Sequence, residues 1–242
     1  MVLFMNTDIE VICKDVVLSF PVSRKYEKTA AVASSRDYAN NKSFRALNGV
    51  SLTIKKGERI GLLGRNGAGK STFLKMLAGV YLPESGRLRV NRPTTSLFEV
   101  SVGTDRAATG YENIKLLMAS RGIPMSHYQH VVSDVETFTE LGEALCRPMR
   151  TYSSGMKLRI AFAIATYSAN PILLMDEVIG TGDKQFRINA RERVKSIIDQ
   201  IDTLVMASHN NNLLKKYCDR GLVFDAGQII FDGPIKDAVK LL

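Results

Sequence analysis

The alternation of apolar and polar positions divides the chain into predicted strands and loops. Residues 9–20 (IEVICKDVVLSF) alternate in part, which predicts a strand. Residues 46–63 predict two strands separated by a turn at Lys56-Gly57, and residues 86–99 predict two shorter strands. Residues 21–45 are polar, rich in Ala, Ser, Lys and Asn, and have no period. We therefore expect residues 21–45 to form an inserted loop.

The second half of the chain has mainly helical spacing. From Gly110 to Met149 apolar residues recur at intervals of three and four, which predicts helices. This helical block interrupts the alternation of strands and helices, so we expect residues 100–155 to form a helical subdomain. The remaining predictions are a helix at 154–168, a strand at 171–175, a helix at 184–200, a strand at 203–208, a helix at 211–217 and a strand at 221–224. Strands that alternate with helices favour a parallel α/β sheet with helices on both faces.

One segment carries a specific chemical pattern. Gly64-Arg65-Asn66-Gly67-Ala68-Gly69-Lys70-Ser71 matches G-x-x-x-x-G-K-[ST], the pattern of phosphate-binding loops. Glycines let backbone N–H groups surround an anion without a side-chain clash. Residues 59–63 predict a buried strand before the loop, and residues 71–79 predict a helix after it, whose positive N-terminus faces the phosphates. Lys70 can reach the β- and γ-phosphates, and the Ser71 hydroxyl can ligate Mg²⁺.

Three further residues, in two segments, suit nucleotide chemistry. The apolar strand 171–175 leads into Asp176-Glu177, at the strand end where ligands of open α/β folds bind. Asp176 could hold Mg²⁺, and Glu177 could deprotonate an attacking water, although two solvated acids at a strand end are the alternative. Ser153 is a good N-cap for the helix that follows it, and such a helix end either binds a phosphate or is an ordinary cap.

Composition narrows the class of protein. The chain has 242 residues, of which 45% are hydrophobic and 24% charged, values typical of a globular domain. A net charge of +9 allows nucleic acid, an anionic membrane surface or acidic partner loops as partners. The basic residues are dispersed and we find no nucleic-acid-binding motif, so we do not expect nucleic acid.

Cysteine, histidine and apolar runs add little chemistry. Cys13, Cys146 and Cys218 lack metal-ligand or redox spacing, so we expect buried thiols in a reducing compartment. His127 and His130 have no nearby ligand partner, which favours a surface loop or helix over a metal site. The apolar stretch at the N-terminus is too short for a signal peptide. The longest apolar run contains Asn170-Pro171, so we do not expect it to span a membrane. We expect the chain to stay in the cytosol.

Taken together, the motifs resemble the nucleotide-binding domain of ATP-binding cassette (ABC) transporters across nearly the whole chain. Tyr152-Ser153-Ser154-Gly155-Met156 lies where that family has its LSGGQ signature, with Ser153 and Gly155 matching and the other three positions departing from it. The resemblance implies a P-loop NTPase (RecA-like) core with an antiparallel β subdomain and an inserted α-helical subdomain, forming a single domain over 1–242. It assigns phosphate or nucleotide contacts to Gly64, Asn66, Gly67, Ala68, Gly69, Lys70, Ser71, Thr72, Ser153, Gly155 and Asp183.

The resemblance also assigns catalytic and metal-binding roles. Asp176 and Glu177 match the Walker B acid and the catalytic glutamate, and Thr181-Gly182-Asp183 occupies the D-loop. His209 matches the switch histidine that contacts the γ-phosphate, and Lys70 completes the predicted catalytic set. Mg²⁺ is assigned to Ser71, Asp176 and Glu99, where Glu99 replaces the family's usual Gln. Phe20 is expected to stack on adenine, with Phe44 as the competing aromatic residue.

One branch of the family resembles this chain at the positions where the chain departs from the family's usual residues. Glu99, the segment 109–114 and the Tyr-Ser-Ser-Gly-Met-Lys-Leu-Arg signature look like the ATPase subunits of bacterial exporters of O-antigen, capsule or teichoic acid. Some members of that branch carry a C-terminal carbohydrate-binding domain, which we do not expect here because the chain stops at Leu242. A non-transport ABC ATPase acting on nucleic acid is the alternative, and no zinc module, heptad run or second cassette supports it.

The resemblance therefore implies an ATPase that exports a lipid-linked surface polysaccharide, most simply O-antigen. ATP and Mg²⁺ are the implied ligands. The implied partners are a second copy of the chain, arranged head to tail, and a separate transmembrane permease that carries the glycan. We expect the protein on the cytoplasmic side of the cell membrane.

Overall fold

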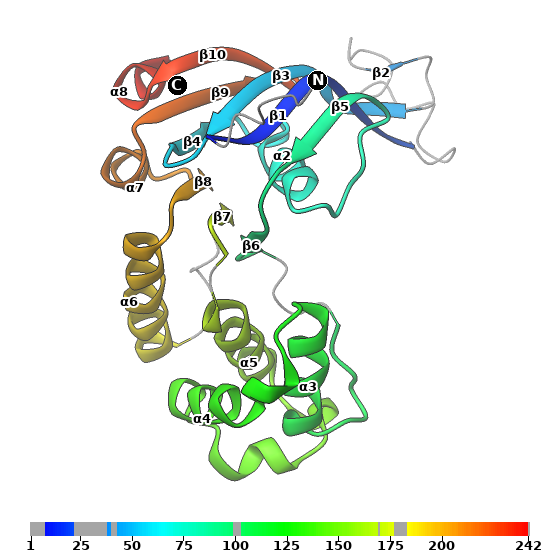
Figure 1. Ribbon diagram of the computed structural model, residues 1–242, viewed down its shortest axis with the longest axis vertical. Helices are drawn as coiled ribbons and strands as arrows, with labels where there is room; N and C mark the ends of the chain where they lie inside the picture. The colour runs from blue at the N-terminus through cyan, green and yellow to red at the C-terminus, as the bar shows by residue number, and fades with distance from the viewer. Residues whose placement is uncertain are drawn as a thin grey trace, which may run out of the picture. The chain divides into compact units, whose positions relative to one another are not determined.

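The computed structural model describes residues 8–21, 38–39, 43–98, 103–168, 170–176 and 183–241. The chain divides into two compact units, of which the first comprises Met1–Thr94 with Asp202–Leu242 and the second comprises Thr95–Ile201. Figure 1 labels the elements of both. Most of the predicted loop at 21–45 lies outside the described residues, so its role stays a prediction.

The first unit contains an antiparallel sheet in the order β2-β3-β1-β5 (Figure 1). Its centre is the long pair β1–β3, in which Val16 faces Val50 and Phe20 faces Phe44. Partial alternation along β1 buries one face, which explains why residues 9–20 read as a strand. The strands are β1 (Ile9–Pro21), β2 (Tyr38–Ala39), β3 (Ser43–Lys55) and β5 (Ser85–Val90).

The same unit contains parallel strands. β4 (Arg59–Leu63) runs parallel to both β8 (Thr203–Ala207) and β9 (Arg220–Asp225). Their side chains are almost all buried, which is the pattern of strands covered on both faces. The expected parallel α/β arrangement is confirmed for these strands. The helices of this unit are α2 (Lys70–Leu77), α7 (Asn211–Tyr217) and α8 (Ile235–Ala238), followed by the 3-10 turn η5 (Val239–Leu241).

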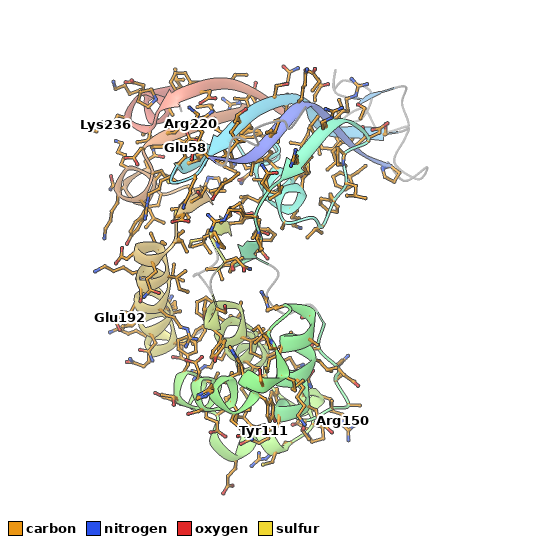
Figure 2. All side chains as sticks on the ribbon, in the orientation of Figure 1. Glu58, Tyr111, Arg150, Glu192, Arg220 and Lys236 are labelled. Carbon is orange, nitrogen blue, oxygen red and sulfur yellow. The ribbon has the colours of Figure 1, made fainter. Side chains whose placement is uncertain are left out.

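Strand β10 (Gln228–Pro234) was not predicted from the sequence. It pairs antiparallel with β9, with Ile229 opposite Phe224. Arg220 at the start of β9 stabilises this hairpin. Its guanidinium donates two hydrogen bonds to Asp232, both at 2.6 Å, and it also donates to Glu58 at about 3 Å. Glu58 and Arg220 are labelled in Figure 2. The ion pairs join β10 to the turn that precedes β4.

The second unit is mostly helical. It also includes two short strands, β6 (Thr94–Ser96), which crosses into the unit at its start, and β7 (Ile172–Asp176). Leu97 N–H donates to Leu174 C=O at 3.0 Å. Its helices are α3 (Gly110–Ser120), α4 (Tyr128–Thr139), α5 (Ser154–Tyr167) and α6 (Lys184–Gln200), with 3-10 turns η2 (Met125–His127), η3 (Gly142–Cys146) and η4 (Met149–Thr151). The boundaries 100–155 for a helical subdomain remain a prediction.

Aromatic rings join three helices of this unit. Phe138 of α4, Phe162 of α5 and Phe186 of α6 form a triangle with centroid separations of 5.7–5.8 Å. Arg193 of α6 covers the Phe138 ring at 4.7 Å and forms a two-point ion pair with Asp134 of α4. Such a planar, bidentate pair fixes the orientation of α4 against α6 more firmly than packing alone.

Two expectations about surface and membrane can be checked. Cys13 and Cys218 are buried, but the expectation was wrong for Cys146, which is exposed because η3 turns that side chain outward at its last residue. Among the helices of the described residues, none has the length and apolar character needed to cross a membrane.

Candidate nucleotide site

The glycine-rich loop has the backbone that its sequence requires. Gly64, Gly67 and Gly69 all have positive φ, at 132°, 81° and 110°. A Cβ at Gly64 would lie 2.2 Å from Phe224 O, and one at Gly69 would lie 2.7 Å from Ala46 O. Only glycine allows both the conformation and the close approach. The loop therefore follows β4 in a tight path and opens directly into α2.

Lys70 is the first residue of α2 and is only 7% exposed. Its ammonium donates to Gly64 O at 2.6 Å and to Arg65 O at 2.9 Å, so it reaches back across the loop. Ser71 and Thr72 follow in the first helical turn, whose N–H groups have no acceptor within the helix. The loop thus combines a positive charge with N–H groups that have no acceptor in the helix, a combination that suits a polyphosphate.

A hairpin turn that the sequence reading missed supports the loop. Ala226 and Gly227, between β9 and β10, both have positive φ, as a tight hairpin turn requires. Gly227 N–H donates to Ala68 O at 3.0 Å, and Asn48 N–H of β3 donates to Gly227 O at 2.9 Å. These two hydrogen bonds, from Asn48 to Gly227 and from Gly227 to Ala68, therefore connect the phosphate loop to both sheets of the unit. The Asp-Ala-Gly run between two apolar segments was the available signal.

His209 lies at the same sheet edge as the loop. In the parallel pair β4–β8, Leu62 lies opposite Ala207. The phosphate loop starts two residues after Leu62, and His209 stands two residues after Ala207. Carboxyl ends of parallel strands meet at one edge of a sheet. The His209 side chain is exposed, and Asn210 after it caps α7 through hydrogen bonds to Asn212 and Leu213 N–H. This position fits the predicted contact with the γ-phosphate.

Phe20 and Phe44 are brought together rather than separated. They are opposite residues of β1 and β3, so they lie on one face of the sheet. The backbone carbonyl of Ala46, two residues beyond Phe44 in β3, lies 2.7 Å from where a Cβ on Gly69 would be. Strand β3 therefore passes beside the phosphate loop close to Phe44 and the opposite Phe20, and both rings remain candidates for contact with the base. Phe20 packs edge to face on Tyr81, with 5.0 Å between ring centroids.

In the second unit, the signature segment begins helix α5. The Ser153 hydroxyl accepts a hydrogen bond from Met156 N–H at 3.2 Å, and Ser153 itself is exposed. Gly155 has no crowding neighbour beyond Ser153 Oγ, which leaves the backbone of the first turn accessible. Tyr152 is different: its ring is buried and its hydroxyl donates to Ala144 O at 2.5 Å. Tyr152 therefore anchors the signature segment to the rest of the unit, whereas Ser153 is exposed at the start of the helix.

Residues at the start of α3 also contact the signature segment. Thr109 and Glu112 form a capping box, and the fully buried Asn113 amide donates to the carbonyls of Asp105, Ala108 and Thr109. A Cβ at Gly110 would lie 2.6 Å from the Tyr152 hydroxyl. These contacts explain the Thr-Gly-Tyr-Glu-Asn segment structurally: it fixes the backbone that precedes Ser153.

Asp183 caps α6 and pairs with an arginine of the signature helix. Its carboxylate accepts from Phe186 N–H at 2.9 Å and forms an ion pair with Arg159 of α5. The Phe186 N–H bond first, and the Arg159 guanidinium second, hold the pKa of Asp183 below its ordinary value. Arg159 was not among the predicted site residues, because its spacing from Asp183 in sequence carries no signal. Asp176 ends β7 with a half-buried side chain.

Two predicted residues, Glu99 and Glu177, lie outside the described residues, as do Thr181 and Gly182. Among the side chains that the structure describes, no group of three or more acids, histidines or cysteines could hold a metal by itself. Mg²⁺ typically binds proteins through one or two side chains together with substrate phosphates. The hydroxyl of Ser71, exposed in the first turn of α2, and the carboxylate of Asp176 are oxygen donors of that kind.

A strand, a glycine loop with a buried lysine and a helix define a P-loop nucleotide-binding fold. Within that class the chain can be placed further. Residues 47–180 match the family model described as ABC transporter, and the chain belongs to that family. The fold and the family together make it an ABC-type ATPase domain.

Similar curated proteins are export subunits. The chain is 40% identical over 184 residues to the O-antigen export system ATP-binding protein RfbE of Yersinia enterocolitica, covering 76% of this chain and 77% of that protein. It is 34% identical to the O-antigen export system ATP-binding protein RfbB of Myxococcus xanthus, covering 90% and 52%. It is 33% identical to the teichoic acids export ATP-binding protein TagH of Shouchella clausii, covering 90% and 62%. The chain thus spans only about half to two thirds of the last two proteins.

Solved structures confirm the fold. An ATP-binding subunit of an ABC transporter superposes with a TM-score of 0.69 at 20% identity, covering 96% of this chain and 92% of that one. A dimeric ATP-binding cassette in a post-hydrolysis state with ADP and Pi gives a TM-score of 0.67 at 18% identity, covering 93% and 98%. The expected fold class is therefore correct.

Proposed function

We propose that this chain hydrolyses ATP to drive export of a lipid-linked surface polysaccharide across the cytoplasmic membrane, with O-antigen as the first substrate class. The observation that carries the ATPase part is the phosphate loop, where the Lys70 ammonium at the start of α2 reaches back to the carbonyls of Gly64 and Arg65. The export part rests on similarity to O-antigen and teichoic acid export proteins. A capsule or teichoic acid glycan is the closest alternative substrate.

The chemistry is phosphoryl transfer to water. N–H groups of the loop and the Lys70 ammonium, which can exchange Gly64 and Arg65 carbonyls for phosphate oxygens, bind and neutralise the β- and γ-phosphates. Glu177 accepts the proton of the attacking water, and His209 contacts the γ-phosphate. Mg²⁺, held by Ser71, Asp176 and Glu99, would supply charge neutralisation and orientation of the phosphates.

The active assembly in this proposal is a head-to-tail homodimer. Each nucleotide lies between one subunit's phosphate loop and the other subunit's Ser153 helix end. The exposed, N-capping position of Ser153 supports this role, since a helix N-terminus favours an anion. Closure of the dimer would act on a separate transmembrane permease that carries the glycan. The protein would lie on the cytoplasmic face of the membrane.

The test is complementation of a deletion strain. Removing the gene should abolish surface polysaccharide and leave lipid-linked glycan inside the cell, and the wild-type chain should restore export. Lys70→Ala should fail to restore it, whereas Lys236→Ala, which changes an exposed lysine of α8 (Figure 2), should succeed. Normal surface glycan in the deletion strain would contradict export. Co-purification of nucleic acid instead of a polytopic membrane protein would favour the non-transport alternative.

A further inference from the structure

Tyr81 follows the end of the helix that starts at the phosphate loop. Helix α2 ends with Val80 N–H donating to Lys75 O at 2.9 Å and with Gly79 at φ 76°. This is a Schellman cap, in which a left-handed residue turns the chain out of the helix in one defined direction. Because α2 is only eight residues long, or about 12 Å, the cap rigidly relates Tyr81 to the phosphate loop.

The chain beyond Tyr81 is anchored to β1. Glu84 N–H donates to Val17 O at 2.8 Å, three residues before Phe20. Between the two anchors, the Tyr81 ring meets Phe20 edge to face, with an angle of 73° between the ring planes. The Lys75 ammonium also lies over the Tyr81 ring, 5.9 Å from its centroid. Tyr81 is thus held by its own backbone and by a cation–π contact.

We propose that Tyr81 is the positioning residue for the nucleobase end of the site: it holds the Phe20 ring so that Phe20, rather than Phe44, stacks on the base. An edge-to-face partner covers at most one face of Phe20, so Tyr81 leaves another face for a base. An aromatic pair fixes ring orientation better than aliphatic packing does. This inference rests on the proposed ATPase function and adds the residue that sets affinity for a purine base over bare polyphosphate.

The experiment compares two ligands, ATP and inorganic tripolyphosphate, by calorimetry. Both occupy the phosphate loop, but only ATP has a base. Tyr81→Ala should weaken ATP binding roughly threefold to tenfold, the size of one aromatic contact, and leave tripolyphosphate binding unchanged. Tyr81→Phe keeps the ring and should bind ATP like the wild type. Tyr217→Ala is the matched control, because Tyr217 is a tyrosine of the same unit that also has a lysine ammonium, of Lys216, over its ring at 5.0 Å.

A double variant tests whether Tyr81 acts through Phe20. In the Phe20→Ala background, Tyr81→Ala should cost no further ATP affinity, since coupled residues are not additive. Three results would overturn the inference: unchanged ATP affinity in Tyr81→Ala, an equal loss for ATP and tripolyphosphate, or an undiminished loss in the Phe20→Ala background. Failure of the wild-type chain to bind either ligand would instead contradict the proposed ATPase function.

Discussion

At the scale of single residues, Lys70 illustrates how the loop defines its own chemistry. A buried ammonium must have hydrogen-bond acceptors, and here they include the carbonyls of Gly64 and Arg65. Those carbonyls lie within the phosphate loop itself, so a polyphosphate can replace them as the acceptor with little movement of the side chain. The positive-φ glycines are needed for that path and not for packing alone.

Lys70→Ala should therefore weaken ATP binding with little effect on the fold. Hydrogen bonds to charged groups contribute about 1.5–3 kcal/mol, so the loss of this one should weaken ATP binding by at least about tenfold. Calorimetry of ATP binding measures the loss, and thermal melting checks the fold. Lys236→Ala, on the exposed side of α8, serves as the control. Equal affinities in the two variants would show that Lys70 does not contact phosphate.

Glu177→Gln tests the predicted general base. The amide keeps the size of the side chain but cannot accept the proton of the attacking water. Steady-state ATP hydrolysis should fall about a hundredfold or more, the range typical of a lost general base, while ATP binding survives. Glu192→Gln changes an exposed glutamate of α6, labelled in Figure 2, and should leave turnover unchanged. Turnover of Glu177→Gln close to that of the wild type would assign the base elsewhere.

Sequence reasoning at this scale finds residues that belong to a contiguous pattern. The loop from Gly64 to Ser71 could be predicted because all its parts are adjacent in the chain. The turn at Gly227 had a local signal, but its contact with Ala68 could not be predicted, and neither could the contacts of Tyr81 with Phe20 and of Arg159 with Asp183, because the partners are far apart in sequence. No spacing rule relates such pairs before the fold is known.

At the scale of elements, periodicity located the strands and helices well but missed β10 and α8. β10 alternates between half-buried and exposed positions and contains Gly233-Pro234, residues that weaken a strand prediction. Its place is set by pairing with β9 and by the ion pairs of Arg220 to Asp232. Tertiary pairing therefore decided an element that local propensity left ambiguous.

The N-terminus of α6 should give the second unit a component of stability that depends on acid pH. The pKa of Asp183 lies below its ordinary 3.8, so its bonds to Phe186 N–H and Arg159 stabilise the fold above that value. The contribution should be lost as pH falls through the lowered folded-state pKa.

Urea unfolding at pH 6 and pH 3 measures this component. The drop in midpoint between the two pH values should be smaller in Asp183→Asn than in the wild type. Asp199→Asn, which changes an exposed acid near the other end of α6, is the control. If Asp183→Asn shows the full wild-type drop, the carboxylate does not stabilise the helix.

At the scale of the whole molecule, the two units carry different parts of the expected site. Lys70 and His209 belong to the first unit, and Ser153, Asp176 and Asp183 belong to the second. The order of elements predicts a parallel α/β sheet, and the ABC ATPase fold that the resemblance implies agrees with solved ABC cassettes. Composition contributed little to that result, whereas motif order along the chain contributed most.

The composite, head-to-tail site that we propose predicts a charge effect at Ser153 that a monomeric site would not show. Asp and Asn are isosteric and both cap helices well, so Ser153→Asp and Ser153→Asn should each preserve α5. Only the Asp variant places a negative charge where the partner's triphosphate would bind. In the Glu177→Gln background, which should trap bound ATP, light scattering should show an ATP-induced dimer for Asn and a monomer for Asp.

Binding of ATP by the monomer controls for damage to the phosphate loop, which lies in the first unit and should keep its affinity in both variants. High salt should partly restore dimerisation of the Asp variant, because added ions screen repulsion between exposed charges. A dimer of equal stability in the Asp and Asn variants would mean that Ser153 does not face a nucleotide. The site would then have to be completed within one chain, and α5 would need another role.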